Sequence, residues 1–309
     1  MPICNLSARS AAIATAATCL LCSGGGISAQ ELEPRAYSPS PIGTNFLIAN
    51  YTRSDGDVST DPSLPISNVH ATINTGVLGY SRTFGLLGQT ASAAIALPYL
   101  RGDVSGVVGE QGTQVTRSGL GDLRLRFAQS LIGSPALTPE AFAERKPTPT
   151  LGTSLVVIAP SGDYNPTHLV NVGSNRWAFK PEIGASGQAG RWFADAAAGV
   201  WLFTDNHNFF SGHVRGQDPL WSIQFHAGRY FERGFWLAAD AIHYGGGDIV
   251  IDGVSSHDAQ QVTRYGLTLS VPLGAGFSAK LAWSSWLTAH NGGNFDSIGV
   301  TLQYRWLDN

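Results

Sequence analysis

From about residue 43 onward, apolar residues alternate with small or polar residues at a period of two. Near the end of the chain, Ile298, Val300 and Leu302 share one face of an extended segment, and Thr301 and Gln303 share the other. Successive side chains of a β-strand point to opposite faces of a sheet, so this period predicts strands with one apolar and one polar face. Soluble sandwiches and membrane barrels both show such alternation, and alternation alone does not separate them.

The connections between the segments distinguish the two classes. Short connections lie at residues 84–88, 188–190, 232–234 and 274–276. Long polar connections alternate with the short ones along the chain and lie at residues 54–68, 102–118, 161–175, 205–218, 246–260 and 289–293. Short periplasmic turns and longer extracellular loops are the pattern of outer-membrane barrels. One connection on the short side is longer, and within it residues 138–145 predict a brief capped helix.

We therefore predict an all-β protein, a transmembrane antiparallel up-and-down β-barrel of about twelve strands. The expected strands lie near residues 43–53, 69–83, 89–101, 119–132, 150–160, 176–187, 191–204, 219–231, 235–245, 261–273, 277–288 and 294–306. Each is long enough for a tilted bilayer crossing of about 9–11 residues. Hydrocarbon offers the backbone no water to bond with, so the sheet must close and leave no unpaired edge.

The first 29 residues predict a secretory signal peptide that is removed. Arg9 supplies the positive charge, residues 11–21 are apolar but too short to span a bilayer, and Ala29 is a small residue before the cut. A lone membrane anchor is the alternative. The remaining divisions that we expect are a periplasmic N-terminal segment at 30–42 and a single barrel domain at 43–309.

Composition excludes several classes of function. Cleavage removes Cys4, Cys19 and Cys22, which are all the cysteines, so we expect neither disulfides nor a Cys-based metal or redox site. Losing Arg9 changes the formal net charge from −3 to −4, too weak a field to indicate nucleic acid as a partner. We expect no cofactor and no metal. The expected partners are outer-membrane lipid, a small-molecule solute and the outer-membrane assembly machinery.

The predicted register points the charged side chains of the strands into the lumen. The lumen candidates are Asp122, Arg124, Arg126, Lys180, Glu182, Asp195, His226, Asp240, Arg264, Lys280 and Arg305. With Arg176 included, basic side chains outnumber acidic ones by seven to four. Two interpretations stay open, since buried ionic groups must pair or stay wet. One is a structural ion-pair network, and the other is a slightly cationic constriction that favours anionic or polar solutes.

A second inward set is aromatic and consists of Trp201, Phe203, Trp236, Tyr244 and Trp286. Aromatic side chains suit weak binding of ring compounds, but bulky side chains also simply fill small barrels. In the wall itself, Pro181 cannot donate to a strand ladder and therefore predicts an irregularity.

Several stretches resemble a family of outer-membrane transporters associated with a meta-pathway of phenol degradation. They are EPRAYS (33–38), GYSRTF (79–84), GLGDLR (119–124), NVGSNRWAFKPE (171–182), DPLW (218–221) and QYRW (303–306). The resemblance covers nearly the whole mature chain. It implies an integral barrel of the Gram-negative outer membrane that admits aromatic compounds.

Three functions remain from the sequence. The first is a porin-like channel or diffusion facilitator for small solutes, with aromatic, phenol-like compounds or their anions among them. The alternative is a non-conducting barrel with a structural or surface-interaction role. An enzyme is not expected, because neither Gly-x-Ser-x-Gly nor His-Glu-x-x-His occurs. The remote alternative is a hydrolase using loop histidines and aspartates, namely His207, His213, His257, Asp205, Asp218 and Asp258.

Overall fold

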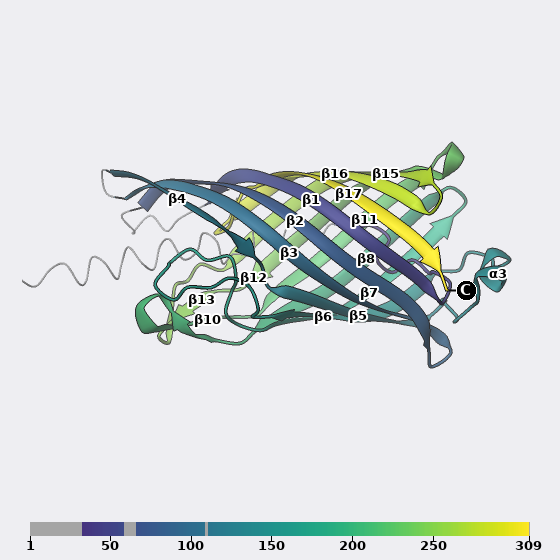
Figure 1. Cartoon of the computed structure of the whole chain (residues 1–309), viewed down its shortest axis with the longest axis horizontal. Helices are drawn as coiled ribbons and strands as arrows, with labels where there is room; N and C mark the ends of the chain where they lie inside the picture. The colour runs from purple at the N-terminus through teal and green to yellow at the C-terminus, as the bar shows by residue number, and fades with distance from the viewer. Residues whose placement is uncertain (1–32, 59–65, 109–110, 309) are drawn as a thin grey trace, which may run out of the picture.

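The computed structural model describes residues 33–58, 66–108 and 111–308, and the predicted signal peptide lies outside them. Within the described ranges, twelve antiparallel strands close into one barrel (Figure 1). No helix in those ranges is long and apolar enough to cross a membrane. The predicted fold class is confirmed.

The barrel strands pair around the wall in chain order. They are β1 (Thr44–Val58), β2 (Ile66–Leu86), β3 (Gln89–Val108), β5 (Leu123–Ile132), β6 (Thr150–Ala159), β7 (Ala178–Ala189), β8 (Trp192–Phe203), β11 (Leu220–Tyr230), β12 (Trp236–Gly246), β15 (Gln260–Gly274), β16 (Phe277–His290) and β17 (Asp296–Leu307). Pairing of β1 with β17 closes the ring. Each predicted strand overlaps one of these twelve.

The outer surface of the barrel is apolar and the inner surface is polar. In β11, Trp221, Ile223 and Phe225 are 42%, 56% and 52% exposed, while Ser222 and His226 are only 2% exposed. A water-soluble protein would bury the first three side chains and expose the other two. Lipid is the medium that stabilises this inverted arrangement, because it covers the apolar band as a protein core would.

Tight turns join the strands at one end of the barrel. Leu87 and Gly88, like Ala275 and Gly276, have positive φ angles, as the two central residues of a type I′ hairpin require. The C-terminus and α3 (Pro139–Ala143) lie at this end too (Figure 1). Thr138 caps α3 by accepting a hydrogen bond from the N–H of Ala141, which confirms the predicted helix. By the asymmetry of outer-membrane barrels, this is the periplasmic end.

At the opposite end, the described parts of two predicted loops are instead strand. β4 (Gln111–Leu120) pairs with the outer half of β3. β1 and β2 also remain paired with each other as far as Val58 and Val69. The described parts of these two expected loops, residues 54–58 and 66–68 of the first and 102–108 and 111–118 of the second, are therefore extensions of the wall. The polar composition of these segments correctly indicated exposure to water. It did not reveal the strand pairing, because a hairpin outside the membrane has no lipid-facing side and therefore needs no alternating apolar residues.

Two other predicted loops, 205–218 and 246–260, together build a separate small sheet. Its strands, in spatial order, are β14 (Val254–Ser255), β13 (Ile249–Ile251), β10 (His213–Gln217) and β9 (Asn206–Phe209). The connecting 3-10 turn is η1 (Phe210–Gly212), and a second, η2 (Glu232–Gly234), joins β11 to β12. The pairing of β10 with β13 joins two different loops, and no local pattern in either loop predicts it.

Pro181 interrupts the ladder as expected. The pairing between β7 and β8 omits Lys180 and Pro181 and resumes in the same register on both sides. On the neighbouring strand, a Cβ at Gly199 would lie 2.9 Å from Lys180 Cε and 3.0 Å from the carbonyl oxygen of Pro181. The irregularity is therefore a gap in hydrogen bonding over a glycine, and not a bulge.

The exposed face of β17 generates a test of the register. We expect Leu302→Arg to destabilise the barrel by about 2–4 kcal/mol, because it places a charge in the lipid near mid-strand. Thr301→Arg, on the opposite face of the same strand, should cost much less. The measurement is urea unfolding of both refolded variants in lipid vesicles. Equal losses at the two positions would contradict the register.

Candidate functional site in the barrel lumen

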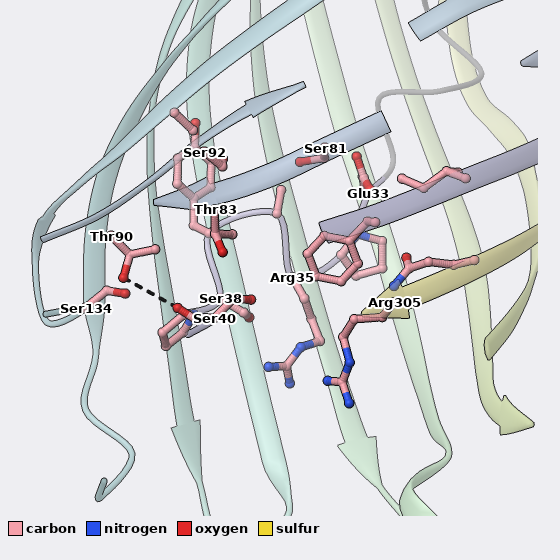
Figure 2. Close-up of a pocket in the computed structure, with 18 of the residues that line it drawn as sticks. Glu33, Arg35, Ser38, Ser40, Ser81, Thr83, Thr90, Ser92, Ser134 and Arg305 are labelled. Carbon is pink, nitrogen blue, oxygen red and sulfur yellow. Dashed lines mark hydrogen bonds between the residues drawn. The ribbon is translucent and has the colours of Figure 1, made fainter. Parts of the chain in front are cut away.

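The described part of the N-terminal segment runs inside the barrel along β6, β7 and β8 (Figure 2). The backbone N–H of Arg35 donates to Asp195 Oδ2 at 2.9 Å, and the hydroxyl of Tyr37 donates to Glu182 Oε1 at 2.8 Å. Thr150 Oγ1 in turn donates to the carbonyl of Tyr37 at 2.9 Å. Sequence reasoning placed 30–42 only as a periplasmic segment and did not anticipate that it contributes to the lumen.

Glycines on the inner wall make room for this segment. A Cβ at Gly184 would lie 2.2 Å from the Tyr37 ring, and one at Gly152 would lie 3.1 Å from it. These two glycines face each other across β6 and β7. Arg126 also lies over the Tyr37 ring, with its guanidinium carbon 5.4 Å from the centroid. The paired inner glycines were the signal in the sequence that a side chain from elsewhere fills this space.

One side of the lumen holds buried ionic pairs. Lys180 Nζ lies 2.8 Å from Glu182 Oε2, and the two side chains are 4% and 8% exposed. His226 Nδ1 lies 2.7 Å from Asp240 Oδ1, and Thr268 donates to the other oxygen of that carboxylate. These predicted lumen residues are thus held by protein partners. For this side of the wall, the structural network is the better interpretation.

Two further lumen candidates fasten extracellular loops. Asp122 accepts hydrogen bonds from the N–H groups of Gly162 and Ser174, at 2.9 and 2.8 Å, so it anchors the 161–175 loop. It precedes β5 and does not lie beside Arg126 within that strand. Arg264 donates to the hydroxyl of Ser284 at 2.9 Å, as well as to groups just before and at the start of β17.

The predicted aromatic set divides between core and surface. Trp201 is 1% exposed and stacks on Phe203 with ring centroids 6.4 Å apart, inside an apolar cluster of β6, β7 and β8. Tyr244 is also buried. Trp286 is 39% exposed, although its partner in the β15–β16 ladder is Arg264, which is buried on the inner face. Of the five, Trp236 alone lines either of the two adjoining cavities on the β1, β16 and β17 side of the lumen.

Two adjoining cavities follow one side of the barrel interior. The larger, about 450 Å³, lies at the periplasmic end, and its charged lining residues are Glu33, Arg35, Arg126, Lys280 and Arg305 (Figure 2). The second, about 280 Å³, extends farther along the lumen and includes Arg124. Both are lined by Ile48, Arg126, Lys280 and Gln303, among others, so they adjoin. Open space thus follows the β1, β16 and β17 side of the wall.

One of the loop histidines, His213, lies beside Asp252, which was not among the aspartates considered from the sequence, with Nδ1 2.5 Å from Oδ2. The pKa of Asp252 is lowered because the N–H of Val214 donates to its carboxylate and His213 adds a second hydrogen bond. These contacts hold β10 against the turn between β13 and β14. In the part of the chain that the structure describes, no group of three or more His, Cys, Asp or Glu side chains could hold a metal ion.

Comparisons with known proteins agree with this architecture. A family model described as "Putative MetA-pathway of phenol degradation" matches residues 52–304. The chain is similar to the COG4313 outer membrane channel from Pseudomonas putida F1, with 24% identity and a TM-score of 0.77, over 89% of this chain and 100% of that one. None of the curated proteins compared with the chain matches it.

Lower similarity extends to two autotransporter barrels. The transport unit of AIDA-I from Escherichia coli shares 10% identity at a TM-score of 0.49, over 84% of this chain and 90% of that one. The β domain of the Bordetella autotransporter BrkA shares 14% identity at a TM-score of 0.49, over 84% and 98%. The fold, supported by the match to the outer membrane channel, is that of an integral outer-membrane protein.

The buried Lys180–Glu182 pair generates a stability test. We expect Lys180→Met to cost about 3–5 kcal/mol, because it leaves a buried carboxylate without its cation. The double variant Lys180→Met/Glu182→Gln should recover much of that loss, since no uncompensated charge remains. Urea unfolding of the refolded proteins measures both. A double variant as unstable as the single one would show that the pair is not the source of the loss.

Proposed function

The chain belongs to the family described as "Putative MetA-pathway of phenol degradation", and from this we propose that its barrel is a passage for small solutes across the outer membrane. Aromatic compounds and their anions are the solute class that we propose. Export through a signal peptide at residues 1–29 and insertion by the outer-membrane assembly machinery belong to the same proposal. The outer surface contacts lipid, and the solute path lies inside.

The adjoining cavities are the observation that carries this proposal. A barrel filled by side chains alone has no reason to leave two adjoining cavities of about 450 and 280 Å³ on one side of its lumen. The opposite side is closed by buried pairs and by the apolar cluster around Trp201. The lumen is therefore divided into a packed wall and a polar path.

The charges along the path favour anions. Each of the four acidic lumen candidates has a protein partner: Asp122 holds a loop, Glu182 pairs with Lys180, Asp195 accepts from the Arg35 N–H, and Asp240 accepts from His226 and Thr268. Five cationic side chains line the two cavities against two acidic ones, Glu33 and Asp240, so the lining carries an excess of positive charge. In a confined, partly low-dielectric space this field is screened less than at a surface.

Single-channel recording on the refolded protein in planar bilayers tests the proposed function. We expect small, stepwise conductance in potassium chloride, because the two cavities adjoin along the lumen. A protein that inserts as a folded barrel and yet conducts no ions would contradict the proposal and favour the non-conducting surface-interaction barrel. Liposome swelling with neutral and charged aromatic solutes then ranks the permeants.

Ion selectivity is a separate prediction. In a salt gradient the reversal potential should show anion preference, and Arg124→Ser/Arg126→Ser should reduce it, because both side chains line the second cavity. Arg229→Ser is the matched control, since Arg229 lies on the exposed face beside Trp192. Cation preference of the unmodified protein, or an equal shift from the control, would contradict this prediction.

A further inference from the structure

We propose that the 450 Å³ cavity at the periplasmic end is a binding site for the carboxylate of a small aromatic acid. The inference rests on the proposed function, and it narrows the solute class from aromatic compounds and their anions to one kind of anion. It also gives the N-terminal segment a role in recognition, because that segment supplies part of the cavity lining.

The cavity is lined by more positive than negative charge. Four cationic side chains and a single acidic one line it, namely Arg35, Arg126, Lys280, Arg305 and Glu33. Glu33 is engaged at long range by Lys280, with 3.9 Å between Oε1 and Nζ. Among the residues that the structure describes, neither Arg126 nor Arg305 forms an ion pair with an acidic side chain. A bound anion that fits the cavity would compensate this excess of positive charge.

Two of the guanidinium groups at this cavity each have a nitrogen without a hydrogen-bond acceptor. Arg35 Nη1 and Arg126 Nη2 are fully buried and have no partner within the described ranges. Buried donors without acceptors are destabilising and uncommon in folded proteins. Tyr37 lies under the Arg126 guanidinium, and Phe193 and Tyr230 lie under that of Arg35, so both groups are held in place by rings. A guanidinium group that is held in place at a cavity wall suits a carboxylate, which it can bind through two parallel N–H···O hydrogen bonds.

Aromatic side chains beside these cations favour a ring on the ligand. Phe46 lies directly opposite Arg305 in the β1–β17 ladder, so both side chains leave the same inner face. Trp236 lines the same cavity from β12. Figure 2 shows the Arg35 and Arg305 side chains projecting into the shared space. Flat apolar groups next to fixed cations match an aromatic carboxylate better than they match a compact inorganic anion.

Isothermal titration calorimetry on the refolded protein, in a neutral detergent, tests the site directly. The probes are benzoate, benzyl alcohol of similar shape without the charge, and inorganic phosphate. We expect benzoate to bind at least about tenfold more tightly than either of the others, since one charged hydrogen bond accounts for roughly that factor.

Substitutions locate the binding. Arg126→Gln and Arg305→Gln should each weaken benzoate binding about tenfold or more, as one charged contact is lost in each. Arg229→Gln is the control, because it removes a cation that contacts aromatic rings on the exposed face. Urea unfolding of each variant verifies that the barrel remains folded. Unchanged affinity in both cavity variants overturns the proposed site.

The remaining outcomes separate the two proposals. Benzyl alcohol binding as tightly as benzoate would refute recognition of the carboxylate, and phosphate binding as tightly would refute recognition of the ring. Conductance without benzoate binding overturns this inference and leaves the passage intact. Benzoate binding that depends on Arg126 and Arg305, in a barrel that does not conduct, would support the binding site and contradict the proposed passage.

Discussion

Hydrocarbon provides no hydrogen-bond partner for a peptide group, and the rest of this structure depends on that constraint. The strands must pair on both edges, which closes the wall, and closure through β1 and β17 leaves no free edge in the membrane. Once the ring is closed, side chains have only two environments. Apolar residues contact lipid, and polar residues must find partners or water inside. The inverted burial along β11 follows directly.

The polar residues of the interior find partners or water in two different ways. Along β7, β8, β11 and β12, carboxylates and cations pair with each other or with hydroxyl groups, and the space is filled. Along β1, β16 and β17, the cations face open space. The N-terminal segment lies between these regions and belongs to both. It binds the packed side through Tyr37 and contributes Arg35 to the open side.

The barrel could be predicted because its signals are local. A period of two within each strand and the length of each connection can be recognised without knowing which strands meet. The small sheet of β9, β10, β13 and β14 could not be predicted, because Arg215 and Ile251 come from separate loops. The position of Tyr37 was equally hidden, since Gly152 and Gly184 leave a space whose occupant lies over a hundred positions away. For the site, alternation identified inward charges but not which of them are neutralised.

The position of Arg35 has a consequence for the order of folding. Its partner Asp195 is 160 residues away in the chain, and Tyr37 needs β6 and β7 in place before its ring has a space to enter. Contacts of such high contact order form only after the entropy of closing a long loop has been lost. Neighbouring hairpins can therefore form early, whereas the segment around Arg35 and Tyr37 becomes ordered only after β6, β7 and β8 have paired. The lining of the lumen is thus completed later than this part of the wall.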